Sequence, residues 1–187
     1  FLGDARPEAG VVVLEGEPVN IRMGRESLIE LGFGYVDFYK SSVFPQLSFK
    51  DNLTITSLNR LTSRTMIHTR LEKRVVEDLL KALDFPSENI KRPLSEVSKR
   101  EQLVAALYKW ILNRSKVVVL NNVLSGTDMI MRNIVGQFLN ELRRRKAGAL
   151  LFSPNTQELY ELCDRVYKVR AGRVEDEIVV GSGEGSR

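Results

Sequence analysis

Residues 115–128, Ser-Lys-Val-Val-Val-Leu-Asn-Asn-Val-Leu-Ser-Gly-Thr-Asp, decide how the chain folds. Lys116 to Leu120 is a short apolar run rich in β-branched residues, which predicts a strand buried on both faces of a parallel sheet. Ser125 to Thr127 supply a turn, and Asp128 can cap the helix that follows. The apolar residues of that helix recur at helical spacing, as Met131, Ile134, Val135, Phe138, Leu139 and Leu142.

Two amides, Asn121 and Asn122, follow this strand directly. Ligand sites in α/β proteins lie at the carboxyl ends of such strands, and many phosphate-handling enzymes place acidic side chains there. An amide accepts no proton at neutral pH and is a poor ligand for a hard cation. The pattern therefore predicts the architecture of a nucleotide site without its acid-base and metal-binding groups.

The 187 residues are 43% hydrophobic, with 28 basic and 24 acidic side chains, and this length suffices for one well-buried core. The basic excess is small and dispersed, so a dedicated nucleic-acid surface is not expected. Cys163 is the only cysteine, which excludes an internal disulfide and fits a cytosolic protein. No apolar run reaches the roughly 18 residues of a membrane span, so direct membrane insertion is not expected. Because Phe1 is not a methionine, we expect further sequence before it.

The N-terminal third combines short strands with one helix. Residues 11–14 and 18–22 predict a hairpin, 25–31 a short helix and 33–36 a strand. From Leu47 to about Val97 the strand signal disappears and helical spacing takes over. This change predicts an inserted helical subdomain, whose clearest helix covers residues 69–84.

The C-terminal half alternates helices and strands. Ser98 with Glu101 three residues later predicts a capping box at the start of a helix. Residues 149–152 predict a second buried strand, followed by a turn and a short helix that ends at Cys163. Residues 165–170 and 173–180 are expected to close the sheet, and 181–187 to form a flexible tail.

With that order of elements, the chain resembles the second nucleotide-binding half of the tandem ATP-binding proteins of bacterial sugar importers, the ribose/galactose/arabinose group of the ABC transporter family. The likeness covers roughly residues 1–177. Its most specific matches are the hairpin at 10–19 and the segment 162–166 followed by 171–174; 34–36 and 51–54 also match.

The resemblance implies an α/β fold with a partial RecA-like ABC ATPase core, in which a mostly parallel sheet is joined by an N-terminal antiparallel hairpin. This core would comprise residues 1–46 and 98–180 and would be incomplete at its N-terminus. The inserted α-helical subdomain would comprise residues 47–97.

In this family ATP lies on the Walker A loop of one domain and under the signature motif of another. The Walker A loop would precede Phe1 and is absent from this chain. Phe38 stands at the Q-loop position, Asn121 at the Walker B aspartate, Asn122 at the catalytic glutamate and Pro154 at the switch histidine. The general-base and metal-binding roles are thus lost together, and no catalytic or metal-binding residue is expected.

The signature motif aligns with residues 97–102, where Ser98 and Gln102 are retained while Lys99 and Arg100 replace its glycines. Under the resemblance, the nucleotide-binding candidates are Ser98, Lys99, Arg100, Gln102 and the D-loop residues Gly126 and Asp128. One alternative is that they are only helix caps and turn residues. Another is that the two cations bind a phosphate without hydrolysing it.

The resulting hypothesis is a degenerate cassette that pairs with a competent ATPase half and docks on a transmembrane permease, at the cytoplasmic face of the membrane. ATP and Mg²⁺ are expected as ligands only on the basis of the resemblance. The apolar residues that suit a permease helix, or equally the subdomain's own core, are Phe38, Tyr39, Val43, Phe44, Leu47 and Phe49. The alternatives are a working ATPase whose Walker A loop lies upstream, and a basic nucleic-acid-binding module.

Overall fold

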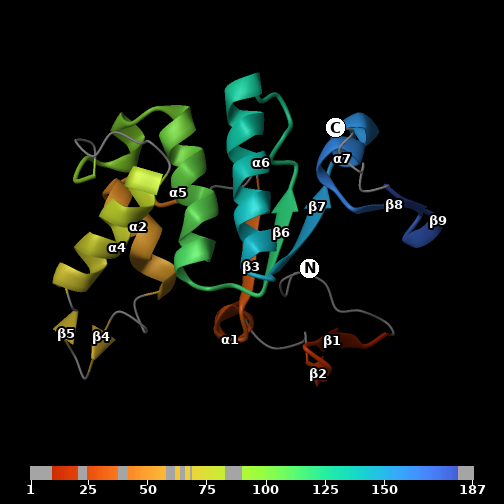
Figure 1. Ribbon diagram of the computed structural model, residues 1–187, viewed down its shortest axis with the longest axis horizontal. Coiled ribbons are helices and arrows are strands. Elements are labelled where there is room, and N and C mark those ends of the chain that lie inside the picture. The colour runs from red at the N-terminus through yellow and green to blue at the C-terminus, as the bar shows by residue number, and fades with distance from the viewer. Residues whose placement is uncertain are drawn as a thin grey trace, which may run out of the picture.

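The computed structural model describes residues 10–20, 25–37, 42–57, 62–63, 66–67, 69–82 and 90–180 (Figure 1). Its elements are, in order, β1 (Val12–Leu14), β2 (Glu17–Val19), α1 (Arg25–Glu30), β3 (Phe33–Asp37), α2 (Phe49–Thr54), η1 (Ile55–Ser57), β4 (Thr62–Ser63), β5 (Met66–Ile67), α4 (Thr69–Ala82), η3 (Leu94–Glu96), α5 (Lys99–Leu112), β6 (Val117–Asn121), α6 (Met129–Arg144), β7 (Gly148–Phe152), α7 (Thr156–Leu162), β8 (Arg165–Arg170) and β9 (Arg173–Val179).

The centre of the fold is a parallel sheet in the order β3-β6-β7. Strand β6 lies between the other two, and its residues Val118, Val119 and Leu120 are each at most 1% exposed. A strand flanked on both sides and covered on both faces is built from a continuous apolar run. This confirms the prediction for residues 116–120, one position further along the chain.

Strand β7 differs from its prediction. It forms at 148–152, but Leu150 and Phe152 are 43% and 47% exposed, so the prediction of a buried strand is wrong. The prediction that 165–180 closes the sheet is also wrong, because β8 and β9 pair only with each other in an antiparallel sheet of their own. With β6 on one side only, β7 is an edge strand of the sheet that the structure describes.

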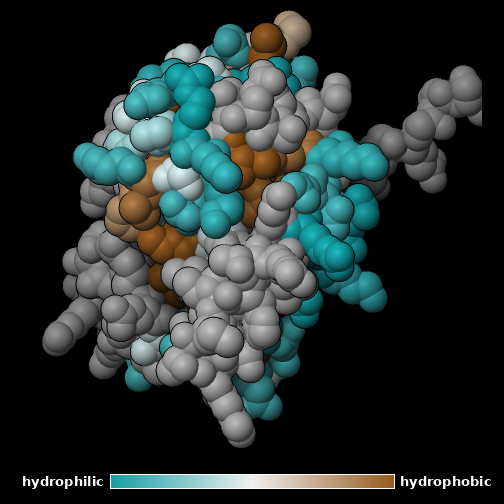
Figure 2. All heavy atoms as spheres, turned by 90° about the vertical axis from the view of Figure 1, so that its left-hand side faces the viewer, coloured by the Kyte–Doolittle hydropathy of each residue, from teal (hydrophilic) through white to brown (hydrophobic). Residues whose placement is uncertain are grey.

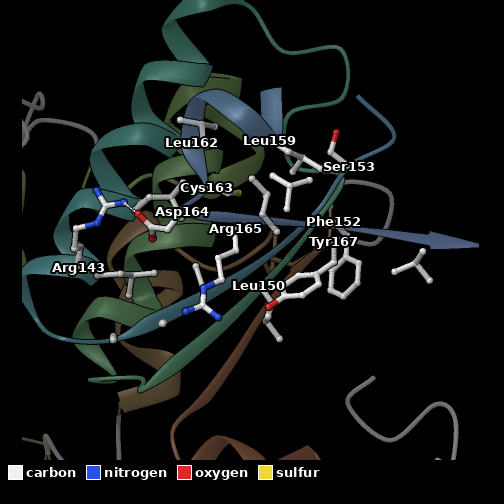
Figure 3. A pocket seen from close by; sticks show the side chains of 18 residues that line it. Arg143, Leu150, Phe152, Ser153, Leu159, Leu162, Cys163, Asp164, Arg165 and Tyr167 are labelled. Carbon is white, nitrogen blue, oxygen red and sulfur yellow. Dashed lines mark hydrogen bonds and ion pairs between the residues drawn. The ribbon is translucent and has the colours of Figure 1, made fainter. Parts of the chain in front are cut away.

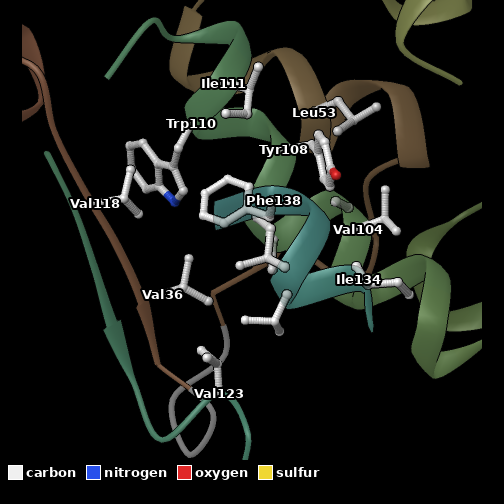
Figure 4. Close-up of a cluster of buried hydrophobic side chains, with 14 of the residues drawn as sticks. Val36, Leu53, Val104, Tyr108, Trp110, Ile111, Val118, Val123, Ile134 and Phe138 are labelled. Atoms are coloured by element: carbon white, nitrogen blue, oxygen red, sulfur yellow. The ribbon is translucent and has the colours of Figure 1, made fainter. Parts of the chain in front are cut away.

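Helices α5 and α6 cover one face of this sheet (Figure 1). The predicted capping box is present at the start of α5, and Asp128 caps α6. Between the helices, Tyr108 and Phe138 meet edge to face, with ring centroids 5.6 Å apart. Figure 4 shows these rings among Val36, Val118 and other buried side chains, which confirms the apolar faces predicted for both helices.

The N-terminal hairpin is confirmed, although β2 begins one residue earlier than predicted. Glu15 and Gly16 form its two-residue turn with φ of 54° and 87°, the left-handed backbone that a tight hairpin favours. The hairpin packs on a small second cluster built on Leu28 and Phe33. Residues 21–22, the predicted end of its second strand, lie outside the described ranges.

The described residues between 47 and 97 are mainly helical, as predicted, and form α2, η1, α4 and η3. The two-residue strands β4 and β5 were not predicted. Leu53, Leu80 and Leu94 belong to the same buried cluster as the sheet residues, so no apolar boundary separates this segment from the core. Figure 2 looks onto this side and shows hydrophobic surface among hydrophilic atoms. The proposed domain limits stay a prediction, and residues 83–84 and the predicted tail lie outside the described part.

Candidate functional site

The carboxyl ends of the parallel strands place the predicted positions Asn121 and Asn122 beside the end of β7. In the sheet register Asp37 lies beside Asn121, and Asn121 beside Phe152. Pro154 follows two residues after the end of β7 and is exposed. Phe38, the proposed Q-loop residue, is not among the described residues.

Asp37 is the only carboxylate at these three strand ends, and the sequence analysis did not single it out. Its side chain is 6% exposed. The Tyr35 hydroxyl donates to Asp37 Oδ2 at 2.7 Å, and Asn121 Nδ2 donates to the same oxygen at 3.0 Å. A carboxylate only accepts hydrogen bonds, so Asn121 must turn its NH₂ group toward it.

Asn122 has a backbone reason for its identity. Its φ is 52°, in the left-handed region that asparagine tolerates better than most residues. Its N–H donates to Phe152 O at 2.9 Å, and its Nδ2 lies 3.4 Å from Asn121 Oδ1. The side chain is therefore part of the turn that leaves β6.

These residues do not fit a Mg²⁺ ion. Mg²⁺ takes oxygen ligands in octahedral geometry, whereas Asn121 presents an N–H donor to the carboxylate and Pro154 has no side-chain donor atom. Within the described ranges, no group of three His, Cys, Asp or Glu side chains could hold a metal. The arrangement also lacks a group placed to act as a general base at position 122.

A buried lysine, Lys109, is connected to Asp37 through Ser42. The backbone N–H of Asp37 donates to Ser42 Oγ at 2.9 Å, and Lys109 Nζ donates to Ser42 O. Burial lowers the pKa of Lys109 to about 8, and its ammonium lies 5.1 Å from the centroid of the Trp110 ring. The sequence does contain a signal for this buried lysine, because Lys109 lies next to the apolar face predicted for the helix.

The proposed signature residues lie at the first turn of α5. Ser98 Oγ accepts from the N–H of Glu101 at 3.2 Å, and Glu101 Oε2 accepts from the N–H of Ser98 at 2.7 Å. Gln102 donates to Val97 O at 3.1 Å. Both retained polar side chains therefore serve the helix itself, whereas Lys99 and Arg100 are exposed.

The predicted D-loop residues form a turn at the surface. Gly126 has φ of 66° and is exposed, and Asp128 Oδ1 accepts from the N–H of Met131 at 2.8 Å. Met129 and Ile130, which follow, are 78% and 56% exposed. The start of α6 thus presents two adjacent apolar side chains outward.

The aromatic segment before α2 is divided between core and surface. Phe49 is fully buried and Val43 packs against the core, whereas Phe44 and Leu47 are 52% and 37% exposed. The buried amide of Asn52 accepts from the N–H of Phe44 at 2.7 Å and donates to Phe44 O at 2.8 Å. These two hydrogen bonds of Asn52 fix the backbone at Phe44. Phe38 and Tyr39 lie outside the described residues.

A groove of about 610 Å³, which the sequence analysis did not predict, lies between β7 and β8 (Figure 3). Leu150 and Phe152 line it from β7, and α7 and the end of α6 complete its walls. Arg143 and Asp164 form an ion pair of 3.0 Å beside it. Burial and the Asp164 carboxylate raise the pKa of the Cys163 thiol, which disfavours the nucleophilic thiolate.

No protein-family model matches the chain. It is 30% identical over 189 residues to the ribose import ATP-binding protein RbsA of Chelativorans sp., a match that covers the whole of this chain and 37% of that protein. It is 27% identical over 170 residues to the xylose import ATP-binding protein XylG of Geobacillus kaustophilus, covering 90% and 34%. The chain therefore spans about a third of the length of these curated relatives.

Among solved structures, the fold matches the ADP conformation of MJ1267, an ATP-binding cassette of an ABC transporter, with a TM-score of 0.75 at 16% identity over 95% of this chain and 72% of that one. A dimeric post-hydrolysis state of the cassette MJ0796, bound to ADP and Pi, matches with a TM-score of 0.73 at 17% identity, covering 95% and 76%. In the described residues no helix is long and apolar enough to cross a bilayer. The chain has the fold of an ATP-binding cassette, and its sequence relatives are the ATP-binding proteins of ribose and xylose importers.

Proposed function

We propose that the chain is a catalytically degenerate ATP-binding cassette of a sugar importer, which acts as a structural or regulatory partner of a competent ATPase half. The observation that carries this proposal is the arrangement of the two amides at the carboxyl end of β6. There Asn121 is bonded to Asp37, and Asn122 belongs to a turn. Neither amide can act as the base that hydrolysis needs, and an uncharged amide is a poorer Mg²⁺ ligand than a carboxylate.

The exposed apolar start of α6 supports a role in assembly. Met129 and Ile130 directly follow the turn that matches the D-loop, and adjacent exposed apolar side chains favour burial against another protein. The proposed partner at this surface is a second cassette, in the same or a sister chain. A permease would dock near Phe44 and Leu47 and would hold the protein at the cytoplasmic face of the membrane.

ATP turnover of the complete protein, assembled with its importer partners, tests this function. Asn122→Gly keeps the positive φ but removes the side chain, and we expect it to leave turnover unchanged. The pair Met129→Glu and Ile130→Glu should reduce turnover by weakening contact with the competent half. A loss of about tenfold or more in the Asn122→Gly variant, about 1.4 kcal/mol in activation free energy, would show instead that this site hydrolyses ATP.

A further inference from the structure

The single carboxylate at the end of the sheet stands on β3 rather than on β6. We propose that Asp37 and Asn121 form an acid–amide pair that closes this edge from within the protein, at the place where the family resemblance puts a metal-binding carboxylate. The pair fastens β3 to β6 without a cation. This inference concerns the edge itself and does not depend on the proposed transport role.

Consecutive hydrogen bonds connect the side chains at this edge. Asp37 and Asn121 are direct neighbours in the parallel register. Tyr35 and Asn121 both donate to Asp37 Oδ2, at 2.7 and 3.0 Å, and Asn122 Nδ2 lies 3.4 Å from Asn121 Oδ1. Tyr35 reaches the carboxylate because alternate residues of a strand point to the same face.

The pair explains why an amide stands at position 121. Asn121 Nδ2 lies 3.0 Å from Asp37 Oδ2, so a second carboxylate at position 121 would stay in contact with the first only if the two shared a proton. The amide instead supplies the donor that a buried carboxylate needs. Asp37 and Asn121 are therefore complementary, and an aspartate at position 121 alone would keep the contact only by taking up a proton, which destabilises the edge above the usual pKa range of a carboxyl group.

The pair continues from the sheet to helix α5. Ser42 Oγ accepts from the N–H of Asp37 at 2.9 Å and lies 3.4 Å from Asp37 O, while Lys109 Nζ donates to Ser42 O. The Lys109 side chain is thus linked to the backbone of Asp37 through Ser42, while the Asp37 carboxylate contacts Asn121 and Tyr35. These bonds hold Ser42 beside the end of β3.

The experiment is hydrogen–deuterium exchange of the β3 and β6 amides in the complete protein. Asn121→Asp should accelerate their exchange by about tenfold or more, which corresponds to about 1.4 kcal/mol, because it sets two carboxylates side by side. Asp37→Asn should accelerate it less. The exchanged pair Asp37→Asn with Asn121→Asp restores one acid and one amide, and it should return the rate to within about threefold of the wild type.

The matched control is Asn133→Asp, the same change at an exposed position of α6, which should leave β3 and β6 unaffected. Millimolar Mg²⁺ should not slow exchange in the wild type. The proposal is overturned if the exchanged pair is as poorly protected as Asn121→Asp, if Asn121→Asp has no effect, or if Mg²⁺ protects the wild-type edge, since Asp37 would then be available to a cation.

Discussion

At the scale of single residues, Lys109 makes stability depend on pH. Its pKa is about 8 in the folded chain against an ordinary value of 10.5, so its charged form is disfavoured by folding. This cost is full below pH 8, where both states are protonated, and it falls as the pH rises toward 10.5. We therefore expect the free energy of unfolding of the wild type to rise by about 1 kcal/mol between pH 7 and 9, relative to Lys109→Met. Urea unfolding of both proteins at the two pH values measures this difference, and a constant difference would contradict the assignment.

Gly34 on β3 is the second residue whose replacement has a defined physical cost. A Cβ built there would lie 2.8 Å from Cδ2 of the buried Trp110 ring, so the indole must shift within a packed core. We expect Gly34→Ala to lower the free energy of unfolding by about 1–3 kcal/mol in chemical denaturation. Gly136→Ala is the control: its Cβ would meet only Leu162, at 3.8 Å, and removing a mid-helix glycine should stabilise α6 by up to about 1 kcal/mol. Equal effects of the two substitutions would refute this packing argument.

At the scale of elements, substitutions at Ser98 can distinguish whether this residue caps α5 or binds a ligand. Its hydroxyl satisfies the N–H of Glu101 within the capping box. We expect Ser98→Ala to destabilise the chain by about 1 kcal/mol, and Ser98→Asp, which can cap in the same way, to retain most of the stability. Thermal unfolding in the absence of nucleotide measures this difference. If both variants unfold like the wild type, Ser98 is not needed as a cap, and the result would favour a nucleotide-binding role for its hydroxyl.

The elements predicted most accurately are those whose burial and capping follow from their own residues. The β-branched run of β6, the capping box of α5 and the apolar stripe of α6 each predicted the observed structure, because burial and capping act over a few positions. The run of β7 is equally apolar, yet most of its residues are exposed. Their exposure depends on which elements lie beside and over the strand, and the local sequence does not specify these. The pairing of β8 with β9 alone depends likewise on neighbours that the local pattern does not encode.

The candidate site shows the same limit between elements. Asn121 and Asn122 were predicted because they directly follow a recognisable strand. Asp37 was not, because its importance arises from the register of β3 against β6, across 84 positions in the sequence. Lys109 and Ser42, 67 positions apart, were missed for the same reason. A site built by pairing distant segments becomes visible only when the register is known.

At the scale of the whole molecule, the chain combines the fold of a cassette with a closed strand edge. Its buried cluster runs from Val118 and Phe138 in the centre to Leu80 in the helical segment, so the described parts share one continuous core. Met129 and Ile130 at the start of α6 are exposed, whereas Asn121 and Asn122 at the end of β6 are half-buried. The surface proposed for assembly and the positions proposed to have lost their catalytic groups therefore belong to different elements, so substitutions can test the two proposals separately.

The nucleotide affinity of the 187-residue chain is the last prediction, because it depends on the molecule as a whole. The sequence contains no Walker A motif, whose backbone N–H groups and lysine hold the phosphates. Lys99 and Arg100 remain as the exposed cations at the start of α5. We expect no measurable heat on titration with MgATP in calorimetry at physiological salt. Micromolar binding would contradict this expectation, and loss of that binding in the Lys99→Ala, Arg100→Ala pair, but not in the neighbouring Arg92→Ala control, would locate the phosphate at α5.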